Sequence, residues 1–128
     1  MATDELTAAL HACAAGSCPL EAGVALLAAE GTFLRRSDFT GRFIEHGTGS
    51  GTAMAAIDWD AAIAALQAGE LPCSGGERRV LMLSASLAGG IPVDLRDAAT
   101  GLDDRNIQRL VTAIMHASGK RPGSGTCR

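Results

Sequence analysis

Aromatic and large aliphatic residues are scarce in this sequence. It contains no tyrosine, one tryptophan and three phenylalanines among 128 residues. Leucine, isoleucine, valine and phenylalanine together occupy 27 positions, which is near the level at which disorder becomes an alternative. The net charge is only −3, however, and 24 residues are alanine. Because alanine favours helix and lets helices approach closely, the composition predicts a folded, mainly α-helical domain.

The sequence also lacks the usual signals of membrane insertion and export. No uninterrupted apolar run approaches the ~18 residues of a transmembrane helix. The acidic segment Met1–Glu5 does not resemble a signal peptide, which begins with a basic stretch followed by an apolar one. We therefore expect a cytoplasmic protein with no membrane partner and with reduced cysteines. The four cysteines are Cys13, Cys18, Cys73 and Cys127.

Lysine and asparagine are nearly absent, whereas arginine is frequent. The chain has ten arginines but one lysine and one asparagine. Arginine, alanine and glycine have mostly GC-rich codons, while lysine, asparagine and tyrosine have AT-rich ones, so the bias indicates a bacterium with a GC-rich genome. It also weakens any argument that a single arginine was selected for function.

Charge differs between the two halves of the chain. Residues 1–70 carry three arginines against nine acidic residues, a net charge of −6. Residues 71–128 carry eight basic against five acidic residues, a net charge of +3. This asymmetry favours a polar partner in general more than a nucleic acid in particular.

Helix boundary signals are frequent and agree with one another. Stretches with helical periodicity begin at Ser, Thr or Asp and end at Gly, which are the preferred residues at helix starts and stops. In Ser74-Gly75-Gly76-Glu77 the spacing is that of a capping box, and the lysine of a phosphate-binding loop is missing. The first helix is expected to be capped by Thr3 or Asp4. The predicted helices cover residues 4–15, 19–30, 59–68, 75–88, 95–100 and 104–118.

The segment between the second and third of these helices allows two interpretations. Either Ser37-Asp38 caps a short helix that presents Phe39 and Phe43, or residues 42–46 form a strand. We expect a small β-hairpin around residues 42–57, with a glycine-rich loop at 47–51 that is longer than a two-residue turn.

These patterns together predict the fold class and the domain organisation. We expect a mainly α, compact domain of five or six helices, to which the small hairpin is added. It occupies residues 1–119, and residues 120–128 form a disordered tail. Within it, the helix at 19–30 is apolar on more than one side, since Leu20, Val24 and Leu27 form one stripe and Leu26 lies elsewhere. Such a helix is either central to the fold or part of an oligomer contact.

The sequence predicts no catalytic residue, cofactor or metal site. Cys13 and Cys18 have no second cysteine pair to complete a zinc site, and Cys13 lies at an apolar position of its helix. Cys18 is the best candidate for a reactive thiol, because it precedes a helix N-terminus, whose dipole favours the thiolate. Two pairs of neighbouring carboxylates, Asp58 with Asp60 and Asp103 with Asp104, are explained by their position at helix starts as caps and partners of the helix dipole.

Residues 76–118 also resemble a helix-turn-helix arrangement in which residues 104–118 would contact DNA. The residue pattern of the preceding segment argues against it, because Arg96 and Asp97 fall where such motifs place apolar or small side chains. The polar residues on the outer face of the last helix would be the DNA-contacting ones, and Arg105, Gln108 and Arg109 are the main candidates. Thr112 and His116 share that face.

Three function classes follow from these observations. The leading hypothesis is a small non-catalytic regulatory protein that acts by binding a protein partner or a second copy of itself. A DNA-binding regulator that uses residues 76–118 is the alternative, and a thiol- or metal-dependent enzyme is a further one.

Overall fold

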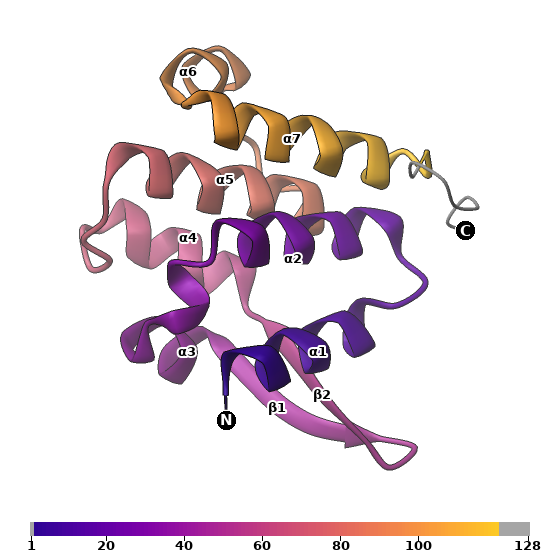
Figure 1. The fold of residues 1–128 in the computed structure, drawn as a ribbon. Coiled ribbons are helices and arrows are strands. Elements are labelled where there is room, and N and C mark those ends of the chain that lie inside the picture. The colour runs from indigo at the N-terminus through magenta and orange to yellow at the C-terminus, as the bar shows by residue number, and fades with distance from the viewer. Residues whose placement is uncertain (1, 121–128) are drawn as a thin grey trace.

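The computed structural model describes residues 2–120 and shows a mainly α-helical domain with one small hairpin (Figure 1). The predicted fold class is confirmed. The described part contains seven α-helices rather than five or six, because the short helix at Ser37–Phe43 forms in addition to the hairpin. The elements are α1 (Thr3–Ala14), α2 (Cys18–Glu30), the 3₁₀ turn η1 (Phe33–Arg35), α3 (Ser37–Phe43), β1 (Ile44–Gly49), β2 (Thr52–Ile57), α4 (Trp59–Gln67), α5 (Gly75–Gly89), α6 (Leu95–Gly101) and α7 (Asp104–Ala117).

Helix α2 lies at the centre of the fold, between two apolar clusters. It packs on α5 and α7 along its length, while α1 and the hairpin lie on its other side (Figure 1). Val24 and Leu27 belong to the larger cluster with α1, α3, α4 and the hairpin. Ala22 and Leu26 belong to the smaller cluster with α5, α6 and α7. The apolar residues on several sides of α2 are therefore explained by its central position. The sequence had allowed this explanation and an oligomer contact.

Helices α2 and α5 approach each other very closely at Gly23. A Cβ atom at this position would lie 2.6 Å from the Cβ of Ala88 and 2.6 Å from the carbonyl oxygen of Ser84. Only glycine fits such a contact, because one of the two obstacles is backbone. The crossing fixes α2 against α5 and thereby sets the position of α7, which packs on both.

Capping side chains start most of the helices, as the sequence predicted. Ser74 accepts from the Glu77 N–H at 3.1 Å, and Glu77 Oε1 accepts from the Ser74 N–H at 2.8 Å, so the capping box is confirmed. The hydrogen bond that the Ser74 N–H donates to the Glu77 carboxylate is the main cause that lowers the pKa of this carboxyl. The predicted cap of α1 is wrong: the helix already includes Thr3, and Ala2 precedes it without a side-chain hydrogen bond.

The Ser74 cap gives a direct test of this description. We expect Ser74→Ala to lower the free energy of unfolding by about 1 kcal/mol, because the N–H of Glu77 then loses its acceptor. Denaturant titration measures the change. Thr100→Ala, which removes an exposed hydroxyl from the last turn of α6, serves as a control with a smaller expected loss. Equal midpoints for wild type and Ser74→Ala would contradict the prediction.

The segment that the sequence left ambiguous forms a short helix followed by a strand, but the expected cap is wrong: Ser37 already lies inside α3, and Arg36 precedes it without a side-chain cap hydrogen bond. Helix α3 ends at Phe43, and β1 begins at Ile44. The expected long loop is wrong, because pairing continues through Gly49 opposite Thr52 and leaves only two residues in the turn. Ser50 and Gly51 both have positive φ angles, 52° and 79°, as a tight turn with the twist of a hairpin requires.

No helix among the described residues is long and apolar enough to cross a membrane. The predicted tail lies, beyond Lys120, outside the part of the chain that the structure describes.

Candidate functional site

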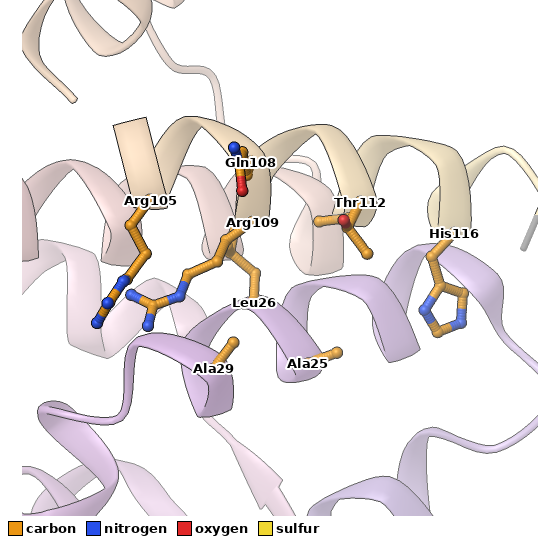
Figure 2. A pocket seen from close by; sticks show the side chains of 9 residues that line it. Ala25, Leu26, Ala29, Arg105, Gln108, Arg109, Thr112 and His116 are labelled. Carbon is orange, nitrogen blue, oxygen red and sulfur yellow. The ribbon is translucent and has the colours of Figure 1, made fainter. Parts of the chain in front are cut away.

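A groove of about 300 Å³ runs between α2 and α7 (Figure 2). We call it the α2–α7 groove. One side comes from α2 and the other from α7, and its residues are Ala25, Leu26, Ala29, Arg105, Gln108, Arg109, Thr112, Ala113 and His116.

The groove exists because α2 presents small side chains there. Leu26 is buried in the smaller apolar cluster and joins α2 to α7. On either side of it, Ala25 and Ala29 extend only a methyl group toward α7 (Figure 2). Larger side chains at these two positions would fill the space, since protein interiors and helix contacts leave few voids. The result is an apolar floor beneath a polar wall.

The polar wall is the face of α7 that the sequence singled out for DNA binding. Arg105, Gln108 and Arg109 are brought together there; the two arginine side chains extend from α7 toward α2, whereas Gln108 stays at the level of α7 (Figure 2). Their spacing of three and four residues puts them on one face of a helix. This face borders α2 and is not open to solvent on every side. DNA binding by these residues stays a prediction.

Positive charge is concentrated at one end of the groove. Arg105 and Arg109 are four residues apart, and Arg109 Nη1 donates to the Asn106 amide oxygen at 2.9 Å, a neutral partner. The residues that line the groove include no acidic side chain. No carboxylate of the groove therefore offsets the repulsion between the two guanidinium groups. Like charges four residues apart destabilise a helix slightly.

The other end of the groove is closed by a pair between helices. His116 Nε2 lies 2.8 Å from Glu21 Oε1, and both side chains are half-buried. The second oxygen of Glu21 accepts from the Gly16 N–H at 2.9 Å, so this carboxylate is held from two directions. The pair connects the last turn of α7 to the first turn of α2 and holds His116 in place.

A different face of α7 carries large apolar side chains that are exposed. Val111 is 52% exposed, Ile114 48% and Met115 41%. With half-buried Ile107 they form one stripe, which we call the α7 apolar face. Of the large apolar residues of α7, only Leu110 belongs to the buried core. The sequence contained the signal for this face, but periodicity alone did not show which residues would be covered.

The cysteines do not form a reactive site with the groove. Cys18 is only 4% exposed and is disulfide-bonded, so the expectation of reduced cysteines is wrong for this residue, and its sulfur is not the accessible thiolate that the sequence suggested. Cys13 is exposed, contrary to its expected apolar position, and is free. Cys73 is free and half-buried, and burial is the main cause that raises the pKa of its thiol. Within residues 2–120 no three His, Cys, Asp or Glu side chains are grouped as metal ligands.

No protein-family model, curated protein or solved structure matches this chain.

Proposed function

We propose that this protein is a non-catalytic binding protein that acts by self-association through the α7 apolar face. One observation carries the proposal. In the described part of the chain, every exposed large hydrophobic residue lies on α6 or α7: Leu95, Val111, Ile114 and Met115. Single exposed hydrophobics are common, but three neighbours on one helix face are typical of an interface.

A second copy of the chain would match this face in residue register and in charge. An antiparallel pair of α7 helices centred on Val111 would set Ile107 of one copy against Met115 of the other. The same pairing would bring Asp103 and Asp104, at the start of α7, near Lys120 of the second copy. Each helix start would also lie beside a helix end of opposite partial charge. Such a contact is self-complementary, as a two-fold dimer requires.

The mass of the protein in solution tests the proposal. We expect a dimer at micromolar concentration by light scattering or analytical ultracentrifugation. Val111→Asp should weaken it roughly a hundredfold or more, because it places a charge in an apolar contact. Ala64→Asp, at an exposed position of α4, is the matched control and should leave the dimer unchanged. A monomer at every accessible concentration, or a dimer that survives Val111→Asp, would show that the proposal is wrong.

A cytoplasmic location and a regulatory role are proposed here as the sequence analysis expected them. The exposed apolar face supports a binding function in general, since its burial would stabilise a complex by about 25 cal/mol per Å² of apolar area removed from water.

A further inference from the structure

We propose that the α2–α7 groove binds a small amphipathic anion, in which a phosphate or carboxylate group is attached to a compact apolar body. The anionic group would bind Arg105 and Arg109, and the apolar body would lie on Ala25, Leu26 and Ala29. This proposal concerns a different face of α7 from the one proposed for self-association.

The charge of the groove points to an anion. Arg105 and Arg109 extend from neighbouring turns of α7 into the same space (Figure 2), and no lining residue is acidic. An oxyanion between them would replace the repulsion of two like charges by two charge-assisted hydrogen-bonding contacts. Guanidinium groups suit this task, because their N–H donors match the geometry of carboxylate and phosphate oxygens.

The floor of the groove points to an apolar body joined to that anion. The methyl groups of Ala25 and Ala29 flank Leu26 below the polar wall. A hydrated inorganic ion would leave this surface in contact with water, whereas an aromatic or short aliphatic group would cover it. The volume of about 300 Å³ is at the lower end of known ligand sites, so the ligand is small.

Two further features set the orientation of the ligand. Gln108 and Thr112 lie along the wall and supply an amide and a hydroxyl that can donate to the anion or to a polar substituent. His116 is already held by Glu21 at 2.8 Å, so the far end of the groove is less available to an anion than the arginine end. The anionic group therefore belongs beside Arg105 and Arg109.

Phenyl phosphate is the probe for this site, with benzoate as the carboxylate counterpart. We expect titration of ¹⁵N-labelled full-length protein to shift amide signals of α2 and α7, and at least one of the two anions to bind. Benzylamine, which has the same ring with a positive charge, should not bind. Inorganic phosphate should bind at least roughly tenfold more weakly than phenyl phosphate, because it cannot cover the apolar floor.

Variants separate charge from shape. Arg105→Gln and Arg109→Gln should each weaken binding roughly tenfold, whereas Arg96→Gln, on exposed α6, should have no effect. Ala29→Leu should abolish binding by filling the groove without changing its charge, and Ala64→Leu on α4 is the matched control. Monomeric Val111→Asp should still bind the probe. A failure of the proposed groove site can therefore be distinguished from a failure of the proposed self-association.

Three results would overturn the proposal. The first is the absence of binding by both organic anions to folded protein. The second is binding that Arg105→Gln and Ala29→Leu leave unchanged, or that inorganic phosphate equals in affinity. The third is tight binding of a mixed DNA duplex that falls steeply with salt and is lost in Arg105→Gln, since that would make the two arginines a nucleic-acid contact.

Discussion

Gly23→Ala is expected to lower the free energy of unfolding by about 2 kcal/mol, although alanine is the better helix former. The added methyl group would lie 2.6 Å from both the Cβ of Ala88 and the carbonyl oxygen of Ser84. A flexible side chain could move aside, but the backbone of α5 cannot do so without separating the two helices. Gly23→Val should lose more. Denaturant titration of each variant measures the effect.

Gly41 provides the matched control for this prediction. It also lies inside a helix, α3, but a Cβ atom there would meet nothing within 4 Å. Gly41→Ala should therefore raise stability by up to about 1 kcal/mol, through helix propensity alone. Adding Ala88→Gly to Gly23→Ala should restore part of the loss, because one of the two obstacles is then removed. If both glycine variants changed stability in the same direction and by the same amount, the close contact of α2 and α5 would be refuted.

The contrast between these two glycines shows why the sequence predicted some features and not others. Caps such as Ser74 depend on residues three positions apart, so the local sequence contains the whole signal. The role of Gly23 depends on Ser84 and Ala88, which lie on another helix some sixty residues away. Neither periodicity nor composition indicates which face of α5 meets α2.

The candidate site was predictable to the same limited extent. The spacing of Arg105, Gln108 and Arg109 identified a polar helix face correctly. That this face lies beside Ala25 and Ala29 depends on how far α7 is rotated about its axis when it packs on α2. The sequence also could not show that Ile114 would stay exposed, since the small second cluster needs only Leu110 and Ala113 from α7.

The second large effect is expected at Phe39, in the cluster remote from α7. Phe39 is fully buried, and its ring centroid lies 5.2 Å from that of Phe33 and 5.3 Å from that of Phe43. Phe39→Ala would leave a cavity among these rings and should lower the free energy of unfolding by about 3–5 kcal/mol. Phe33→Ala in the same background should cost less than it does alone, because the contact between the two rings is already gone.

Native-state hydrogen exchange of Phe39→Ala would show how far the two clusters unfold independently. Helix α7 is held mainly by Leu110 and Ala113 in the smaller cluster, and Phe39 does not belong to that cluster. We therefore expect α7 amides to exchange by local opening, at rates that Phe39→Ala leaves unchanged while exchange in α3 becomes faster. Leu110→Ala should have the opposite effect and accelerate exchange in α7. If Phe39→Ala accelerated α7 exchange by the full loss in global stability, α7 would open only when the whole domain unfolds. Its groove and its apolar face would then have the stability of the entire fold.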